Sequence, residues 1–221
     1  PDLKVVGKSE PKVDALKLVK GRAVFADDME MQGMLFGGLL TSPHAHAKIR
    51  SIDISAASLA PGVVTVLTAK DIPGDNDIGA IRKDEPLLAA LETSFFGQMV
   101  AVVVAQTQEQ ARRAALAVEL EAEPLPAIVG IRAALAAESF QTERHVMKKG
   151  DVDTALQQAP HRLQAELEIG GQDHFYLETH AAFSEVGDEG DIRVLSSTQH
   201  PSEVQAAVAH VLHVPRNQVV V

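Results

Sequence analysis

The chain contains no cysteine and no tryptophan, and it has one tyrosine among its 221 residues. The absence of cysteine excludes disulfides, thiolate metal ligands and iron–sulfur ligation within this chain. Aromatic residues make up 4% of the sequence and hydrophobic residues 46%, so we expect cores built mainly from aliphatic side chains. This composition is compatible with a reducing compartment, and we expect a cytoplasmic location.

Long hydrophobic runs and basic clusters are missing as well. No apolar run approaches the roughly 20 residues that a membrane-spanning helix needs, and we expect no signal peptide in the first residues. The formal net charge is -10 at pH 7, and no basic stripe with interleaved aromatic residues could neutralise phosphates. We therefore expect no membrane partner and no nucleic-acid partner.

Residues 21–126 alternate between strand and helix patterns, which predicts an α/β domain. Thr107 and Gln110 fit a capping box at the start of the second helix, in which the two side chains satisfy free N–H groups reciprocally. Residues 69–96 are polar and contain Pro and Gly, which indicates a long irregular connection. The expected strands are residues 23–25, 34–40, 49–54, 63–67, 99–105 and 120–123, and the expected helices are residues 55–60 and 107–118.

The second half of the chain predicts a further α+β unit. Pro201 fits the first position of a helix, where its missing N–H costs nothing. Short helices are expected at residues 131–138 and 152–158. Strands are expected at residues 162–169, 181–186, 192–196 and 219–221. The sequence thus predicts a lead-in over residues 1–20, an α/β domain over 21–126, a connecting segment over 127–160, and a truncated domain over 161–221.

A glycine-containing run follows the strand expected at residues 162–169. Gly170 and Gly171 permit a positive φ angle and the close approach of another backbone. The functional interpretation is a loop, including Gln172, His174 and Glu178, that packs under a bound cofactor. The structural alternative is a tight turn with its polar residues in solvent.

Gln199 stands between the strand expected at residues 192–196 and the helix that begins at Pro201. Side chains at such positions point into pockets in α/β proteins. A carboxamide there can donate a hydrogen bond to an oxygen atom of a ligand while accepting another. The alternative is a loop residue that only helps to cap the helix.

Three small clusters of histidine or acidic residues could suggest metal sites, but the sequence supports each of them only weakly. His174, Glu178 and His180 would share one face of an extended strand, which leaves a zinc site geometrically open, although polar residues around a turn explain them better. The other groups, His44 with His46 and Asp27 with Asp28, have no third ligand nearby in the sequence. We interpret the histidines as part of a surface turn and the aspartates as the end of a strand.

Several segments, taken in their order along the chain, resemble the molybdopterin subunit of the xanthine dehydrogenase family of molybdenum hydroxylases. The resemblance covers essentially the whole chain, and the ordered set is far more specific than any one segment. The matching segments are residues 21–28, 41–49, 61–63, 71–74, 123–127, 150–152, 170–178 and 197–199.

The resemblance implies a hammerhead α/β domain at about residues 21–126 and the beginning of a molybdopterin-binding α+β domain from about residue 161. It assigns Gln199 to the cofactor site, near an oxo ligand of molybdenum. It also places the loop that contains Gly170, Gly171, Gln172, His174 and Glu178 near the cofactor. No catalytic residue is assigned within this chain, because the family's base and substrate-binding residues would follow Val221.

The implied activity is the hydroxylation of purines or related N-heterocycles at a molybdenum centre, with electrons passed to 2Fe-2S clusters and FAD in partner domains or subunits. The chain would be an N-terminal fragment of such an enzyme and inactive alone. A homo-oligomer is a further expected arrangement, because a truncated final strand exposes a sheet edge. The alternatives are an aldehyde oxidoreductase of the same family and a non-catalytic scaffold or assembly module on the hammerhead fold.

Overall fold

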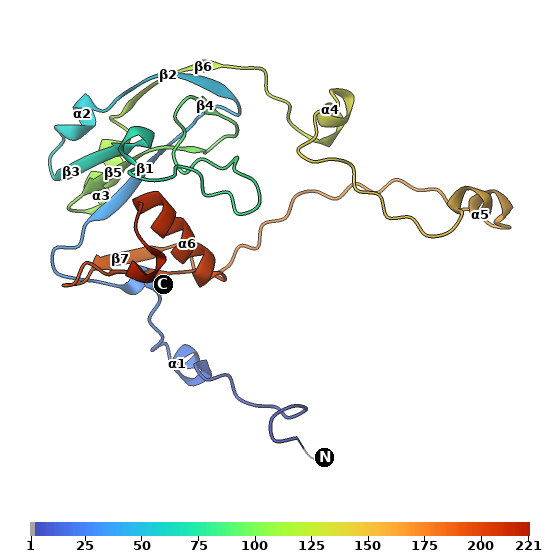
Figure 1. Cartoon of the computed structure of the whole chain (residues 1–221), viewed down its shortest axis with the longest axis horizontal. Coiled ribbons are helices and arrows are strands. Elements are labelled where there is room, and N and C mark those ends of the chain that lie inside the picture. Colours follow the sequence, from blue (N-terminus) through green and yellow to red (C-terminus); the bar gives the residue numbers. More distant parts are fainter. Residues whose placement is uncertain (1–2) are drawn as a thin grey trace. The chain divides into compact units, whose positions relative to one another are not determined.

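The computed structural model describes residues 3–221, which divide into two compact units. The larger unit comprises the chain up to Leu125 together with Leu177–Val221, and the smaller unit is Pro126–Tyr176 (Figure 1). The larger unit contains three small sheets, each of three strands. No helix among residues 3–221 is long and apolar enough to cross a membrane. The predicted boundaries after residues 20, 126 and 160 stay predictions.

The first sheet is built around β5 (Met99–Ala105), which pairs in antiparallel fashion with β1 (Phe36–Thr41) and with β3 (Val63–Thr68). Val100, Val103 and Ala105 of β5 are fully buried. β-branched residues suit a pleated strand that is covered on both faces. The most hydrophobic run of the sequence is therefore the central strand, and the strands predicted at residues 34–40, 63–67 and 99–105 are confirmed.

One face of this sheet is covered by α3 (Gln108–Ala115), and α2 (Ser55–Ser58) packs beside β3. The hydroxyl of Thr107 accepts a hydrogen bond from the Gln110 N–H at 3.2 Å, which confirms the predicted N-cap. The reciprocal half of the predicted capping box is wrong, because the buried Gln110 Oε1 has no hydrogen-bond partner. The Gln110 side chain instead lies against Gly62, at which a Cβ would sit 2.3 Å from it. The core cluster under α3 contains Ala57, Val66, Val103, Ala114, Ala115 and Val118.

The second sheet has the order β4–β2–β6, with β4 at Glu92–Thr93, β2 at Ala47–Asp53 and β6 at Glu119–Pro124. The Arg50 guanidinium pairs with Glu123 across β2 and β6, and the Ser51 hydroxyl donates to Glu121 Oε2 at 2.9 Å. Exposed pairs of this kind contribute up to about 1 kcal/mol each. The sheet therefore depends mainly on the apolar side chains of its other face, which include the buried Ala47 and Ile49.

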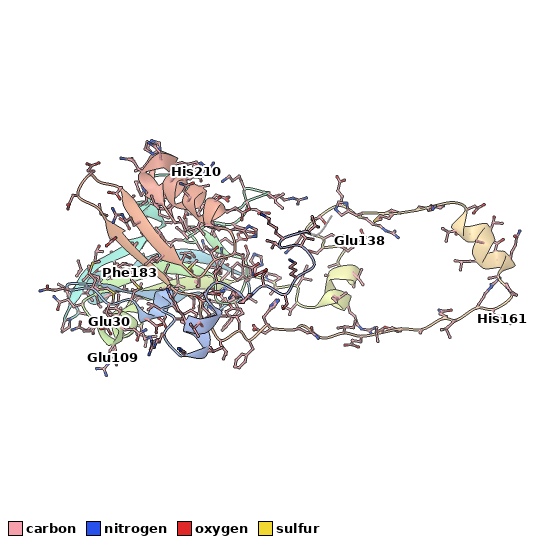
Figure 2. The ribbon with its side chains drawn as sticks, turned by 90° about the horizontal axis from the view of Figure 1, so that it is seen from below. Glu30, Glu109, Glu138, His161, Phe183 and His210 are labelled. Atoms are coloured by element: carbon pink, nitrogen blue, oxygen red, sulfur yellow. The ribbon has the colours of Figure 1, made fainter. Side chains whose placement is uncertain are left out.

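The third sheet lies in the C-terminal part of the larger unit. β7 (Ala182–Val186) and β8 (Ile192–Ser196) form the predicted hairpin, and β9 (Val219–Val220) runs parallel to β8. Figure 2 shows α6 (Pro201–Leu212) against this sheet, with Phe183 of β7 and His210 of α6 labelled. α6 is the connection between β8 and β9, as parallel neighbours require.

Helix α6 ends in a motif that usually contains glycine. His213 has φ 55° and ψ 43°, the left-handed conformation. Its N–H donates to the His210 carbonyl at 3.2 Å, and the Val214 N–H donates to the Ala209 carbonyl at 2.9 Å. These two bonds make a Schellman motif with histidine where glycine is the usual residue.

Two predicted strands are wrong. Residues 162–169 are exposed and form no strand, because their alternating apolar side chains have no partner strand among the described residues; Leu163 is 96% exposed. At residues 23–25 the chain leads into a 3₁₀ turn, η1 (Ala26–Asp28), in which Asp28 Oδ2 accepts the Phe25 N–H at 3.0 Å. An aspartate three residues after an extended residue favours that local turn over a continued strand.

The remaining regular elements are short. The helices predicted in the connecting segment are α4 (Ile131–Ala136) and α5 (Val152–Gln158), both in the smaller unit. Asp151 caps α5 by accepting the Thr154 N–H at 3.1 Å. The other elements are α1 (Ala15–Val19), η2 (Ala69–Asp71) and η3 (Arg216–Gln218), and residues 69–96 are otherwise irregular apart from β4.

Replacing Gly38 by alanine should destabilise the first sheet. A Cβ at Gly38 would lie 2.5 Å from the backbone oxygen of Ala111 in α3, so the helix would have to move away from β1. We expect the free energy of unfolding in urea to fall by about 1–3 kcal/mol. Gly37→Ala is the matched control, because its Cβ would meet only Val102 Cγ1 at 3.9 Å. Equal losses in the two variants would contradict the close packing of β1 on α3.

Replacing His213 by glycine should stabilise the chain. Glycine adopts the left-handed conformation without the steric cost that a Cβ brings, so we expect a gain of about 1 kcal/mol in urea unfolding. The control is His210→Gly in the last turn of α6, which should lose about 1 kcal/mol because glycine weakens a helix interior. A loss of stability in His213→Gly would show that the histidine side chain itself holds the end of the helix.

Candidate functional site

The candidate site lies at the open end of the β7–β8 hairpin. The chain enters β7 and leaves β8 at this end. The Ser197 hydroxyl accepts the Ala181 N–H at 2.9 Å and donates to the Ala181 carbonyl at 3.2 Å. The Ser197 N–H donates to the same carbonyl at 3.1 Å. Residues 177–180 and 198–200 therefore leave the hairpin from one end, and the three hydrogen bonds between Ser197 and Ala181 join the two segments at their bases.

Gln199 is placed by the turn that follows Ser197. The Thr198 hydroxyl accepts the His200 N–H at 3.0 Å, and α6 starts at the next residue, Pro201. The Gln199 side chain is exposed and makes no hydrogen bond or ion pair with any residue of the described range 3–221. Because its side chain makes no hydrogen bond, Gln199 does not cap α6, and His200, which is the N-cap, forms no side-chain cap either.

This arrangement leaves a free carboxamide beside the N-terminal end of a helix of 12 residues. The N-terminal end of a helix carries a partial positive charge of about half an elementary charge. A carboxamide adds an N–H donor that keeps its protonation state at any ordinary pH. Together they suit a ligand that presents oxygen atoms with negative charge.

Glu178 lies on a pocket of about 430 Å³ formed by two segments far apart in the sequence. One wall is Phe25 and η1, which the Asp28–Phe25 hydrogen bond holds in place. Local sequence could not predict that Asp27 and Asp28 would line a pocket with Glu178, because the two segments are brought together by the packing of η1 on β7. The lining residues are Phe25, Ala26, Asp27, Asp28, Leu177, Glu178 and Thr179.

Gly170, Gly171, Gln172 and His174 lie in the smaller unit, in an exposed segment without regular structure. Neither glycine has a positive φ angle, and a Cβ on either would meet nothing within 4 Å. No turn is formed at these two glycines, so that part of the structural alternative is wrong, whereas its polar residues are exposed to solvent as expected. The local turn lies at Asp173, whose Oδ1 accepts the Phe175 N–H at 2.7 Å, and Phe175 itself has φ 45°.

The described residues contain no group of three or more histidine, aspartate or glutamate side chains that could hold a metal ion. His174 lies in the smaller unit, whereas Glu178 and His180 lie in the larger unit, so the zinc site considered for these three residues stays the less favoured alternative. His46 does gain a carboxylate partner, since its Nε2 lies 2.8 Å from Glu92 Oε1 of β4. That partner is distant in the sequence and could not be found from local spacing.

Two family models match the chain in succession. The model described as aldehyde oxidase and xanthine dehydrogenase, a/b hammerhead domain, matches residues 20–126. The model described as molybdopterin cofactor-binding domain matches residues 137–221. The second match contains Gly170, Glu178 and Gln199.

Relatives of known function are similar to nearly the whole chain. The xanthine dehydrogenase of Dictyostelium discoideum is 40% identical over 204 residues, which are 92% of this chain and 15% of that protein. The xanthine dehydrogenase/oxidase of Gallus gallus is 41% identical over 218 residues, 98% of this chain and 16% of the relative. Xanthine dehydrogenase 1 of Arabidopsis thaliana is 42% identical and covers 97% of this chain. The chain thus spans about a sixth of the length of these relatives.

Solved structures share the fold. The aldehyde oxidoreductase of Desulfovibrio gigas superposes with a TM-score of 0.86 and 26% identity, covering 95% of this chain and 25% of that one. The quinoline 2-oxidoreductase of Pseudomonas putida 86 superposes with a TM-score of 0.80 and 28% identity, covering 96% of this chain and 29% of that one. The expected fold class, α/β (α+β) with a hammerhead domain, is confirmed.

Replacing Ser197 by alanine should loosen the base of the site. The Ala181 N–H would lose its acceptor, so we expect its hydrogen exchange to accelerate about tenfold, in line with a loss of about 1.4 kcal/mol. The control is Ser202→Ala in the exposed first turn of α6, which should leave the Ala181 rate unchanged. Unchanged exchange in both variants would mean that the β7–β8 ladder alone holds the two segments together.

Proposed function

This chain belongs to the aldehyde oxidase and xanthine dehydrogenase family, and we propose that it forms part of a molybdenum-dependent hydroxylase of the xanthine dehydrogenase type. The proposed substrates are purines or related N-heterocycles. The observation that carries the proposal is the free carboxamide of Gln199, held between β8 and α6 in the region that matches the molybdopterin-binding model.

The residues present fit such a cofactor on three counts. Gln199 is exposed and has no partner among residues 3–221, so its N–H group is available to an oxygen of the cofactor. The N-terminal end of α6 adds a partial positive charge beside it. The Ser197 bonds to Ala181 fix the position of the turn before ligand binding, which lowers the entropy cost of binding.

In the proposed reaction, the residues of this chain would bind and position the cofactor and would not carry out the chemical step. The cofactor, when bound, would supply the redox chemistry that hydroxylates the substrate. Gln199 would hold and orient the cofactor by donating its side-chain N–H group, and Ser197 would keep Gln199 in place. The loop with Gly170, Gly171, Gln172, His174 and Glu178 is proposed to lie near the cofactor. The resemblance assigns no catalytic base to this chain, so we propose that the 221 residues alone do not turn over substrate.

The proposed partners follow from the same family membership. They are the remaining part of the molybdopterin chain and the iron–sulfur (2Fe-2S) and FAD domains or subunits that would accept electrons. The relatives are larger proteins, of which this chain covers about 16%, and the absence of cysteine from this sequence requires that any iron–sulfur ligands come from elsewhere. A cytoplasmic location is part of this proposal.

The xanthine type is favoured over the aldehyde type by sequence identity. The xanthine dehydrogenases of Gallus gallus and Arabidopsis thaliana share 41% and 42% of their aligned residues with this chain. The aldehyde oxidoreductase of Desulfovibrio gigas shares 26% despite its high TM-score. Fold similarity of this degree is compatible with several substrates, so identity carries the preference.

The test uses the full-length protein that contains this sequence, expressed in a host that makes the molybdenum cofactor. We expect about one molybdenum atom per chain by mass spectrometry and turnover of xanthine or hypoxanthine. Turnover of aldehydes but not purines would replace the proposal by the aldehyde oxidoreductase alternative. Absence of molybdenum from a folded, matured preparation would overturn the enzyme proposal and favour the scaffold alternative.

Replacing Gln199 should lower the rate constant kcat in that protein. Loss of one hydrogen-bond donor at a charged reaction centre costs on the order of a hundredfold in kcat, so we expect that loss in Gln199→Ala. Gln199→Glu should lose at least as much, because it keeps the shape but replaces the N–H donor by a carboxylate oxygen. Gln158→Ala, an exposed glutamine of α5, is the matched control. Full activity with full molybdenum content in Gln199→Ala would contradict the assigned role.

A further inference from the structure

The last turn of α6 receives two hydrogen bonds from a distant segment of the hammerhead domain. The Gly74 N–H donates to the Val211 carbonyl at 2.9 Å, and the Asp75 N–H donates to the His210 carbonyl at 3.0 Å. The last carbonyls of a helix have no partner within the helix and carry its partial negative charge. The Schellman motif at His213 satisfies the carbonyls of Ala209 and His210, and the hammerhead domain adds a donor to the Val211 carbonyl and a second donor to the His210 carbonyl.

Gly74 makes this contact possible by its lack of a side chain. A Cβ at Gly74 would lie 1.9 Å from the His210 oxygen and 2.9 Å from the Val211 oxygen. The φ angle of Gly74 is not in the positive region, so alanine would suit the conformation of the loop itself. Glycine is therefore required by the closeness of α6 and not by the backbone conformation at residue 74.

The segment that carries Gly74 is braced by its own hydrogen bonds. In residues 74–88, which we name the Gly74 loop, Asn76 Nδ2 donates to the Leu88 carbonyl at 2.8 Å and Asn76 Oδ1 accepts the Leu88 N–H at 3.0 Å. The Asp77 N–H donates to Asp75 Oδ1 at 3.0 Å, a bond that is the main cause of the lowered pKa of Asp75. The Lys83 ammonium lies 3.4 Å from Asp75 Oδ2.

The Gly74 loop is in turn anchored in the core of the first sheet. Leu88, its last residue, is 3% exposed, and the next residue, Ala89, is fully buried. The Ala89 N–H donates to the Met99 carbonyl at 2.8 Å, at the start of the central strand β5. A continuous set of hydrogen bonds thus connects β5 to the last turn of α6.

Helix α6 transmits this connection to Gln199. A helix of 12 residues is a stiff element about 18 Å long. Gln205 Nε2 in its middle donates to the Val219 carbonyl of β9 at 2.7 Å, so α6 and the third sheet move together. The Gly74 loop bonds the C-terminal end of α6, and the turn that contains Gln199 leads into the N-terminal end. The position of the loop therefore determines the position of that turn.

We propose that Gly74 is a positioning residue, which docks the last turn of α6 on the hammerhead domain and thereby sets the position of Gln199 relative to that domain. The docking follows from the described contacts alone. Its consequence for a cofactor rests on the proposed function.

The first experiment measures hydrogen exchange in the 221-residue chain with Gly74→Ala. We expect the amides of Asp75 and of residues 209–214 to exchange about tenfold faster, while the amides of β5 keep their protection. Gly38→Ala is the matched control, because its Cβ would also clash with helix backbone, at 2.5 Å, but inside the hammerhead domain, on α3 and away from α6. Wild-type exchange in Gly74→Ala, or the same pattern of losses in Gly38→Ala, would overturn the proposed docking.

The second experiment uses the full-length protein and separates positioning from stability. In Gly74→Ala we expect kcat to fall on the order of a hundredfold, as misplacement by about 1 Å can cause, with molybdenum content and KM unchanged. A loss of molybdenum in proportion to activity would instead show a merely structural role and overturn the positioning role. If the wild-type full-length protein holds no molybdenum, the proposed function fails, and the exchange experiment still decides whether Gly74 docks α6.

Discussion

Burial of β5 is the constraint on which the larger unit depends. The strand is covered by α3 on one face and flanked by β1 and β3 at both edges, and its alternate residues Val103 and Ala105 have no exposed surface. Removing a valine side chain of this kind from water is worth about 1.5–3 kcal/mol. Since Ala89 and the Gly74 loop attach to the first residue of β5, the position of α6 is tied to the same strand.

Local sequence patterns predicted the elements that carry their own signal. The valine-rich apolar run of β5, the Thr107 cap of α3 and Pro201 at the start of α6 are local features, and each gave an element with nearly the expected bounds. The failures came where a pattern needed a distant partner. The alternation at Leu163, Ala165, Leu167 and Ile169 describes a half-buried strand, but no strand of the described chain pairs with it.

In the candidate site, too, local features could be predicted from the sequence and contacts between distant segments could not. Gln199 was predicted to lie between a strand and a helix, and the structure gives it that place, whereas its role at a cofactor came from the resemblance and stays a prediction. The Ser197 bonds to Ala181 and the pocket between Glu178 and η1 join segments whose relation is set by pairing and packing. Gly74 gave no local signal at all, because its φ angle is ordinary and the reason for glycine lies on α6.

The parallel pairing of β8 with β9 has a consequence for the cost of ordering the chain. Ile192 and Val219 pair across the single connection that contains α6, whereas Phe36 of β1 pairs with Ala105 of β5 across more than twice that length of chain. The entropy lost on closing a flexible loop grows with the logarithm of its length, by about 0.6 kcal/mol per doubling. Helix formation shortens the effective span further. The C-terminal sheet thus closes shorter loops than the first sheet does, and it loses less chain entropy when its strands pair.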